Sequence, residues 1–467
     1  YLKDDYSVVD EIPFDFSRRR LSVIVTDKLN NKKMITKGAV EEILNICTKV
    51  SHNNEIFDIT SEIKKNIKKI SVGLNKDGLR VIAICEKNVT NQDTFSIADE
   101  SNMVLTGFIG FLDPPKESAE IAIKRMNEAG IRVIVLTGDN AEVTSCICKK
   151  VGIKTAKIIL GSEIDKLPDS GVIRLIKRKH NVFAKLSPIQ KARIIRLLKA
   201  SGNVVGYMGD GINDTPSLTN SDVGVSVDTA VDIAKETADI ILLEKDLNVL
   251  LDGVTEGRKT FSNLLKYIKL AVSFNFGEVT SVLIASILLP FFPITPIQLL
   301  VQSLLYDIGQ LTLPFDNVDV DSLKKPKKWS IRAIRQFMIF MGPLSSAFDL
   351  IVFAMLWFVF KLGPADAALF QTIWFSYGIV SNLFGMHIIR TSKIPFLQSH
   401  ASKPVYMSSI IVSLLAILVP FTTLGSAIGL VAIPIKYMAL IFLTPVVYCI
   451  IAQLAKHKYI QKYGEWL

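Results

Sequence analysis

The chain has little cysteine, with only five in 467 residues. The five are scattered, which excludes the disulfide framework of a small secreted protein. Cys146 and Cys148 form a Cys-x-Cys pair, and reduced thiols packed in a soluble domain are favoured there over a metal site. With 49% hydrophobic residues, the chain is too apolar to be intrinsically disordered.

Long hydrophobic runs are absent from about the first 260 residues and frequent afterwards. A bilayer core requires about 20 helical residues to cross it. On this criterion the sequence predicts an all-α membrane domain over residues 256–467 with six spans. The predicted spans are Leu270–Phe292, Ile297–Pro314, Phe337–Phe360, Phe370–Ile389, Val405–Leu424 and Leu430–Leu454.

Basic residues are concentrated in alternate links between these predicted spans. They are Lys324, Lys325, Lys327, Lys328, Arg332 and Arg335 after the second span, Arg390, Lys393 and Lys403 after the fourth, and Lys456, Lys458 and Lys462 after the sixth. Because cytoplasmic loops are enriched in Lys and Arg, both ends of the chain are predicted to be cytoplasmic. The formal charge of +10 is thereby explained by membrane topology, with a lipid bilayer as partner and no nucleic acid.

Two soluble domains are predicted before the membrane domain. Residues 1–104 combine short strands, such as Leu79–Cys85, with helical stretches, which is typical of an α+β domain. Residues 105–255 alternate strand and helix, beginning with the strands Gly107–Leu112 and Val133–Leu136. This alternation predicts a parallel sheet covered by helices, with ligands at the carboxyl ends of its strands.

Polar strings follow two of the predicted strands. Thr137, Gly138 and Asp139 come directly after Leu136, and an acidic, glycine-rich turn spans Gly209–Asp214. Glycines allow the backbone to approach an oxyanion closely, and the N-terminus of a following helix offers free amides to a phosphate. The strings therefore indicate a phosphate site, although Asp139 as a simple helix N-cap is the alternative.

Two further residue types fit the same chemistry. Asp210 and Asp214 are four residues apart on the turn and suit a hard cation such as Mg²⁺. Lys191, on a later helix, offers a positive charge to a phosphoryl group, or else is an ordinary solvated lysine. Taken in order, the threonine, the lysine and the acidic turn form the phosphoryl-transfer constellation of the haloacid dehalogenase fold.

These motifs resemble those of the P-type ATPases, as do Asp113-Pro114-Pro115 and the Thr215-Pro216 that follows the acidic turn. The resemblance implies a multidomain protein: an α+β nucleotide-binding domain, a haloacid-dehalogenase-like α/β phosphorylation domain and the membrane domain. It implies ATP and Mg²⁺ as cofactors, with Asp210 and Asp214 as metal ligands. The catalytic residues it implies are Thr137, Gly138, Asp139, Lys191 and Asn213.

The first domain carries strings similar to the nucleotide-binding residues of the same family. They are Phe16-Ser17-Arg18, Lys37-Gly38-Ala39 and Asp77-Gly78-Leu79-Arg80. By this resemblance Phe16 stacks on adenine, Lys37 and Gly38 line the pocket, and Arg18 and Arg80 meet the phosphates. Without the motifs, a lone Phe is more often a core residue and a lone Lys a solvated one.

The predicted spans narrow the resemblance to the bacterial magnesium-transporting P-type ATPases. The strings concerned are Asn275-Phe276-Gly277-Glu278, Leu304-Leu305-Tyr306-Asp307 and Leu313–Asp319. A charged carboxylate at mid-membrane costs about 2.5–3.5 kcal/mol, so Glu278 and Asp307 each require a partner. A divalent cation bound by Asn275, Glu278 and Asp307, with Gln302 and Gln310 as further oxygen donors, satisfies both.

Alternatives remain for this membrane site. Asp307 can instead form an interhelical hydrogen bond, and Asp349 is expected to be structural. Glu278 stands where magnesium pumps of this family commonly have Asn, so Ca²⁺ or another cation is the alternative to Mg²⁺.

The printed sequence lacks the Asp-Lys-Thr-Gly-Thr string that carries the phosphorylated Asp in this family. The resemblance therefore implies the C-terminal part of an ATP-driven pump of the bacterial plasma (inner) membrane, with a missing N-terminal half as partner. The chain alone is expected not to form a phosphoenzyme, and the phosphorylation domain is expected to lack one strand, leaving a gap in its sheet. A truncated remnant or a split-pump subunit is the alternative, whereas a membrane-tethered phosphatase is disfavoured because the nucleophile is absent.

Overall fold

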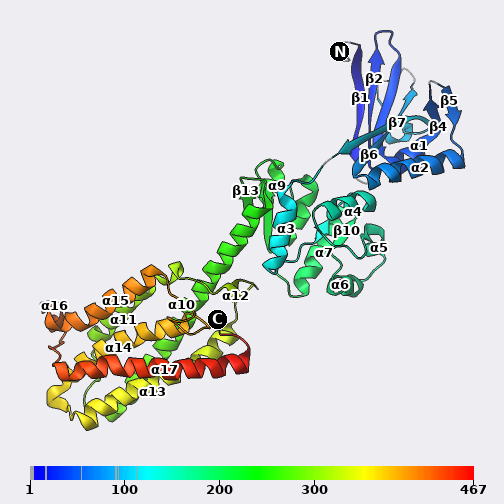
Figure 1. Cartoon of the computed structure of the whole chain (residues 1–467). Helices are drawn as coiled ribbons and strands as arrows, with labels where there is room; N and C mark the ends of the chain where they lie inside the picture. The colour runs from blue at the N-terminus through cyan, green and yellow to red at the C-terminus, as the bar shows by residue number, and fades with distance from the viewer. Residues whose placement is uncertain are drawn as a thin grey trace. The chain divides into compact units, whose positions relative to one another are not determined.

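The computed structural model describes residues 5–15, 18–53, 55–89, 92, 94–112, 114–324 and 326–466 (Figure 1). The chain forms two compact units, Tyr1–Leu251 and Asp252–Leu467. The boundary between the units lies close to residue 256, where the predicted membrane domain begins.

A seven-stranded, mostly antiparallel sheet opens the first unit, with the strand order β1-β2-β3-β6-β7-β4-β5. Its strands are β1 (Tyr6–Asp15), β2 (Arg20–Asp27), β3 (Lys32–Ala39), β4 (Cys47–His52), β5 (Glu55–Asp58), β6 (Leu79–Asn88) and β7 (Met103–Leu112). Helices α1 (Val40–Ile46) and α2 (Ser61–Lys76) pack against it, and α2 is visible beside the sheet in Figure 1. Side chains alternate between the two faces of the sheet, and those on the core-facing side, such as Ile24 of β2 and Met34 of β3, are fully buried.

One buried carboxylate ties the beginning of this sheet to the segment before β7. The Glu100 side chain is fully buried and accepts hydrogen bonds from Arg18 (2.6 and 2.7 Å), Arg20 (2.6 Å) and the hydroxyl of Ser22 (2.8 Å). Burial opposes ionisation of Glu100, but these donors outweigh it and lower the pKa of the carboxyl below its ordinary value of 4.5.

Parallel strands alternate with helices in the remainder of the first unit, as predicted. Two three-stranded parallel sheets form, with the orders β8-β10-β9 and β11-β12-β13. The strands are β8 (Val135–Leu136), β9 (Ile159–Leu160), β10 (Val182–Ala184), β11 (Gly206–Met208), β12 (Val223–Val227) and β13 (Ile240–Leu242). The helices are α3 (Ser118–Glu128), α4 (Ala141–Lys150), α5 (Gly161–Asp165), α6 (Asp169–Lys177), α7 (Pro188–Ala200), α8 (Thr215–Asn220) and α9 (Asp232–Thr237).

Two details differ from the sequence prediction. The strand Gly107–Leu112 was assigned to the parallel sheet, but it lies in β7 and pairs antiparallel with β6 of the first sheet. Strand β10 was not predicted, although it is the central strand of its sheet. Its three residues, Val182–Ala184, are all buried, and so short an apolar run gives no periodic signal.

Strands β8 and β11 are edge strands of these two sheets. Within the described ranges, no strand pairs with the second edge of either one. Both strands lead into the polar strings that the sequence singled out, at Thr137 and at Gly209. The two strands whose ends carry the candidate chemistry are therefore both edge strands, and the missing strand between them stays a prediction.

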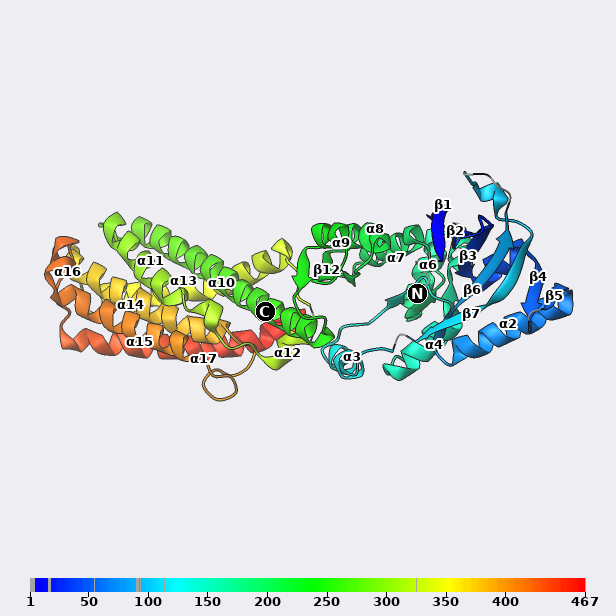
Figure 2. The same ribbon diagram turned by 90° about the horizontal axis from the view of Figure 1, so that it is seen from above.

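Helices dominate the second unit, and their long axes run side by side in Figure 2. The long helices are α10 (Leu247–Leu288), α11 (Pro296–Gln310), α13 (Ile331–Ala354), α14 (Ala367–Ile389), α15 (Lys403–Leu418) and α17 (Met438–Tyr463), and the short ones are α12 (Val320–Leu323) and α16 (Thr423–Ala427). Most residues of α14 are buried, and it contacts α11, α13, α15 and α17. It is therefore the central helix of the bundle.

Four helical stretches in the described part of the chain are long and apolar enough to cross a membrane. They are Leu247–Leu288, Ile331–Val359, Lys403–Phe421 and Ile435–Tyr463, which correspond to the first, third, fifth and sixth predicted spans. The second predicted span corresponds to α11, which has 15 residues, and the fourth to α14, which carries polar side chains among its buried residues. The count of six spans stays a prediction.

A buried ion-pair network joins three parts of the bundle. Asp316 Oδ2 accepts from Lys266 Nζ on α10 at 2.7 Å and from Arg390 Nε at the end of α14 at 2.8 Å, and all three side chains are at most 2% exposed. Lys456 on α17 donates instead to three backbone carbonyls, those of Ile388, Thr391 and Lys393. The string Leu313–Asp319 therefore has a clear structural role at this end of the bundle.

The Glu100 cluster generates a stability prediction. Glu100→Gln removes the charge that compensates Arg18 and Arg20, and we expect the first sheet to lose about 3 kcal/mol of stability. Amide hydrogen exchange of β2 and β3 measures this loss. The control is Glu86→Gln, which breaks an exposed pair with Lys33 and should cost less than about 1 kcal/mol; equal effects of the two changes would contradict the role of burial.

The same cluster predicts a pH dependence. Because the folded-state pKa of Glu100 is lowered, its stabilisation is complete above the unfolded value of 4.5 and is lost as the pH falls through the folded-state value. Exchange in β2 should therefore accelerate below about pH 4.5 in the wild type and be less sensitive to pH in Glu100→Gln. Parallel pH profiles for the two proteins would contradict this prediction.

Candidate functional site

The first polar string forms a compact turn after β8. The Thr137 hydroxyl donates to Asp139 Oδ2 at 3.0 Å and accepts from the Asp139 N–H at 3.1 Å. Asn140, and not Asp139, caps the following helix, because its Oδ1 accepts from the N–H of Val143 at 2.9 Å. The N-cap alternative for Asp139 is therefore wrong.

Asp214 organises the acidic turn after β11. Its Oδ1 accepts from Lys191 Nζ at 2.9 Å and from the phenol of Tyr207 at 2.6 Å, while Oδ2 accepts a weaker bond from the N–H of Gly211 at 3.4 Å. Burial opposes ionisation of Asp214, but these bonds outweigh it and lower the pKa of its carboxyl. Burial and the neighbouring Asp214 raise the pKa of Tyr207, so Tyr207 is a hydrogen-bond donor.

Lys191 is thus not an ordinary solvated lysine. Its side chain is 13% exposed, and its ion pair connects α7, which follows the first parallel sheet, to the turn that follows the second. A cation is held in this way beside the ends of β8 and β11, where an incoming phosphoryl group would need a positive partner.

Gly209 is required by close packing. A Cβ at this position would lie 2.5 Å from the Cβ and 2.7 Å from the Cγ of Asp214, which is closer than real Cβ contacts allow. At Gly211 the nearest atom to an added Cβ is Asp214 Oδ2 at 3.7 Å, an ordinary contact. The first glycine of the turn therefore sets the position of the Asp214 carboxylate.

Asp210 differs from Asp214 in being exposed. Within the described ranges its carboxylate pairs only with Lys245, at 3.1 Å, and both side chains are more than half exposed. Among the described residues, no three Asp, Glu, His or Cys side chains form a group that could hold a metal ion. One or two carboxylates nevertheless fit Mg²⁺, which usually completes its shell with water and substrate phosphate oxygens.

A cavity of about 620 Å³ connects these residues to the first sheet. It is lined by Gly38 from β3, by Gly138 and Asn213 from the turns after β8 and β11, and by Lys191 from α7, together with Lys185 and Glu41. Lys185 and Glu41 also form an ion pair at 3.3 Å. The cavity therefore brings together one predicted nucleotide-binding residue and three predicted catalytic residues.

The other predicted nucleotide-binding residues lie in different places. Arg18 is bonded to Glu100, Arg80 pairs with Asp139 Oδ2 at 2.9 Å, and the exposed Lys37 is not among the residues lining the cavity. Gly38 is held tightly, because an added Cβ would lie 2.6 Å from the carbonyl oxygen of Arg19. Phe16 lies outside the described residues, as does Asp113.

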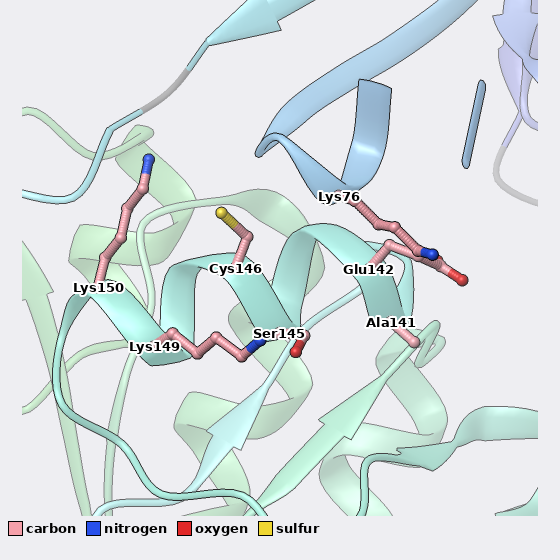
Figure 3. Close-up of a pocket in the computed structure, with 7 residues that line it drawn as sticks. All are labelled: Lys76, Ala141, Glu142, Ser145, Cys146, Lys149 and Lys150. Atoms are coloured by element: carbon pink, nitrogen blue, oxygen red, sulfur yellow. The ribbon is translucent and has the colours of Figure 1, made fainter. Parts of the chain in front are cut away.

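A second cavity of about 510 Å³ lies beside α4 (Figure 3). Lys149, Lys150 and Cys146 of α4 and Lys76 at the end of α2 are among its lining residues. In Figure 3 the three lysine side chains diverge and do not meet at one point. None of the predicted site residues lines this cavity, so it is not the candidate site.

The predicted membrane ligands are only partly brought together. Glu278 Oε1 on α10 accepts from Gln302 Nε2 on α11 at 2.7 Å, and Gln310 is buried. Asn275 and Asp307 are exposed on their helices, and the Asp307 carboxylate makes no hydrogen bond or ion pair with the described residues. The interhelical hydrogen bond that was the alternative for Asp307 is therefore not observed among the described residues.

Sequence reasoning missed three residues that the structure places in these sites. Tyr207 was included only in a predicted strand, Glu100 has no motif, and Lys245 follows the last short strand. Tyr207 lies two residues before the Gly209 turn, so a weak signal existed for it. For Glu100 none existed, since its partners are about 80 residues away in sequence.

The fold and the sites define a class: a multi-pass membrane protein whose large soluble part carries polar, glycine-containing turns at the ends of parallel strands. Two family models match the chain. Residues 1–118 match the model described as "P-type ATPase, cytoplasmic domain N", and residues 291–457 match "Cation transporting ATPase, C-terminus".

Curated relatives lead to the same family. "Magnesium-transporting ATPase, P-type 1" of Escherichia coli (strain K12) is 46% identical over 465 residues, covering 99% of this chain and 52% of that protein. The protein of the same name from Salmonella typhimurium (strain 14028s) is 45% identical, over 99% of this chain and 51% of its own length. "Calcium-transporting ATPase 1" of Bacillus cereus is 32% identical over 76% of this chain and 40% of its own length.

The chain therefore belongs to the P-type ATPases, and it spans about half the length of the magnesium-transporting relatives it matches.

The close packing at Gly209 can be tested directly. Gly209→Ala should displace Asp214 and destabilise the soluble unit by about 1–3 kcal/mol, whereas Gly211→Ala should change its stability little. The measurement is the urea concentration at which half of the soluble unit becomes sensitive to a brief protease pulse. Equal midpoints for the two variants would show that Gly209 does not fix the position of Asp214.

Proposed function

We propose that this chain is the C-terminal part of an ATP-driven P-type pump that transports Mg²⁺ across the bacterial plasma membrane. The observation that carries the proposal is the cavity that Gly38 of the first sheet lines together with Gly138 and Asn213 from the strand-end turns and Lys191 from α7. The identity of 45–46% to two magnesium-transporting ATPases over 99% of the chain supports the choice of ion.

Each of three regions of the chain has its own function in the proposed pump. Residues 1–104 bind the nucleotide, residues 105–255 form a haloacid-dehalogenase-like phosphorylation domain, and residues 256–467 form a membrane domain of six helices. The basic links between the spans support cytoplasmic positions for both ends of the chain. The free edges of β8 and β11 support an additional strand, which carries the phosphorylated Asp and is contributed by an N-terminal half of the pump.

ATP would occupy the 620 Å³ cavity, with Phe16 against the base and Lys37 and Gly38 beside the nucleotide. Arg18 and Arg80 are proposed to meet the phosphates after releasing Glu100 and Asp139, their present partners. Since exchanging one charged partner for another is less costly than exposing a buried charge, each arginine can change partner as the nucleotide binds.

Phosphoryl transfer depends on positioning and charge neutralisation. Thr137 and the backbone at Gly138 are proposed to hold phosphate oxygens at the end of β8, and Lys191 supplies a positive charge from α7. Asn213 adds an amide at the cavity wall. Asp139 orients the Thr137 hydroxyl through their mutual hydrogen bonds.

Asp210, which is exposed and weakly paired, is the residue best able to hold the Mg²⁺ that accompanies ATP. Asp214 stabilises the turn, because its carboxylate accepts hydrogen bonds from Lys191 and Tyr207 and so holds both side chains in place. When bound, Mg²⁺ supplies charge neutralisation at the phosphate oxygens.

Helix α10 connects the proposed phosphorylation domain to the proposed cation site, and so offers a route for coupling ATP hydrolysis to cation transport. It runs without interruption from Leu247 to Leu288, so the same helix begins just after Lys245, the partner of Asp210, and includes Asn275 and Glu278. We propose that Asn275, Glu278 and Asp307 contact the transported cation. The relative named as a calcium-transporting ATPase, together with the extra carboxylate at position 278, makes Ca²⁺ the second candidate ion.

Cation-stimulated ATP hydrolysis by the complete protein tests the function. We expect Mg²⁺-stimulated hydrolysis in the wild type and at least a tenfold loss in Glu278→Ala and in Asp307→Ala, because each removes a charged ligand of the cation. Ca²⁺ is compared in the same assay. Unchanged stimulation in both variants would remove the proposed membrane site, and stimulation by Ca²⁺ alone would reassign the ion.

Nucleotide binding tests the first domain separately. Phe16→Ala should weaken ATP binding roughly 5- to 100-fold, the range expected for the loss of one base–aromatic stacking contact. Calorimetric titration of the purified chain measures the affinity. Phe57→Ala serves as a control, because Phe57 is an exposed phenylalanine of β5 that does not line the cavity, and equal effects of both substitutions would argue against a specific stacking role for Phe16.

A further inference from the structure

The link between α14 and α15, residues 390–402, carries exposed apolar side chains at its tip. Residues 394–397, with the sequence Ile-Pro-Phe-Leu, form this segment and are named the apolar tip. Ile394, Phe396 and Leu397 are 40%, 50% and 79% exposed. Large apolar side chains that are exposed together, and not singly, mark an interaction surface.

The apolar tip has a strained and well-defined backbone. Phe396 has a φ of 65°, in the left-handed region that bulky side chains rarely adopt. The N–H of Ile394 donates to Gln398 Oε1 at 3.1 Å, the N–H of Gln398 donates to the carbonyl oxygen of Ile394 at 2.9 Å, and the N–H of Phe396 donates to the carbonyl oxygen of Ser399 at 3.2 Å. Such strain persists only where the surrounding structure imposes it, so this turn is built to expose Phe396 and Leu397.

The base of the same link is fixed to the bundle. Asp319 accepts from the hydroxyl of Ser399 at 2.8 Å and from the hydroxyl of Thr391 at 2.7 Å. Arg390, which is paired with Asp316, donates to the backbone carbonyl of Ser399 at 3.2 Å. A surface that is held in place in this way loses little conformational entropy when it is covered.

Ring contacts place the apolar tip beside the start of a predicted membrane span. The Phe396 ring lies 6.0 Å from the ring of Tyr406 and 5.1 Å from that of His387. Tyr406 is in the first turn of α15, one of the helices long and apolar enough to cross a membrane. Met407 and Ile410, further along α15, are exposed apolar residues as well. The apolar tip therefore lies where the lipid-facing surface of α15 begins.

The charge of the link suits the surface of a bilayer. It contains no acidic residue. Lys393, directly before the apolar tip, has a partly exposed side chain that approaches Asp321 only to 3.7 Å. Lys403, directly after the link, is exposed and forms no ion pair with the described residues. Apolar side chains flanked by lysines are typical of segments that lie in the membrane interface, because lysine attracts anionic headgroups.

We propose that the apolar tip is an interfacial anchor, which inserts into the boundary between the lipid headgroups and the acyl chains beside the first turn of α15. Phe396 and Leu397 supply the apolar contact, and Lys403 meets the headgroups. Asp319 and Arg390 are positioning residues, because they hold the base of the link. The inference is independent of the proposed pump function, since it requires only that the bundle spans a bilayer.

The test places a fluorescent reporter in the apolar tip of the complete protein, which is reconstituted in vesicles of phosphatidylcholine and phosphatidylglycerol. Leu397→Trp adds one tryptophan, whose emission is the difference between the variant and the wild type. Lipids brominated near the headgroup quench tryptophan on contact. We expect them to remove about half or more of the added emission, as for a side chain held within the interface. Acrylamide in the water should quench it little.

Matched variants calibrate the measurement. Leu29→Trp replaces a leucine that is 82% exposed in the first sheet, and its emission should be quenched by acrylamide and not by brominated lipid. Ile410→Trp, on the exposed side of α15, should be quenched by brominated lipid. Ile394→Trp is a second reporter within the apolar tip and covers the case in which Leu397→Trp does not fold.

Each remaining outcome contradicts the anchor. If acrylamide quenches both reporters in the apolar tip as strongly as it quenches Leu29→Trp, the tip is in water. If neither acrylamide nor brominated lipid reaches them, the tip is covered by protein, from this chain or from a second copy. An Ile410→Trp variant that brominated lipid does not quench would show that the bundle itself is not in the bilayer.

Discussion

Compensation of buried charge is the constraint on which the structure depends. Glu100 is held by two arginines, Asp214 by Lys191 and a phenol, and Asp316 by a lysine and an arginine. Each pairing joins segments that are distant in sequence, so the same contacts that neutralise charge also fix the fold. Removing one member leaves an uncompensated buried charge, which is far more costly than losing an exposed pair.

The interior of the helical bundle departs from this pairing of buried charges. Among the described residues, Glu278 and Asp349 accept from the neutral donors Gln302 and Ser281, and neither carboxylate takes part in an ion pair. Uncompensated acidic side chains, in a chain whose other buried charges are paired, mark a candidate functional region. Such groups persist where a bound ligand compensates them. The soluble site has the opposite character, since its charges are paired: Lys191 with Asp214 and Arg80 with Asp139.

Sequence reasoning succeeded where chemistry is local. The strings at Thr137 and Gly209 lie at the ends of β8 and β11, as expected for parallel strands. The error at β7 has a physical cause: an apolar strand has the same pattern whichever sheet it joins, and its partner β6 is set by long-range pairing. Likewise α14 is central because other helices cover it, which its own hydropathy does not reveal.

The amino-acid sequence by itself determined the family, the division into soluble and membrane-embedded parts, and the residue types at the strand ends, because these follow from short strings and from local apolar runs. Only the tertiary structure decided which charges are paired. Arg18 reaches Glu100 and Asp349 comes to lie beside α10 through packing between segments tens of residues apart, and no local pattern encodes such partnerships.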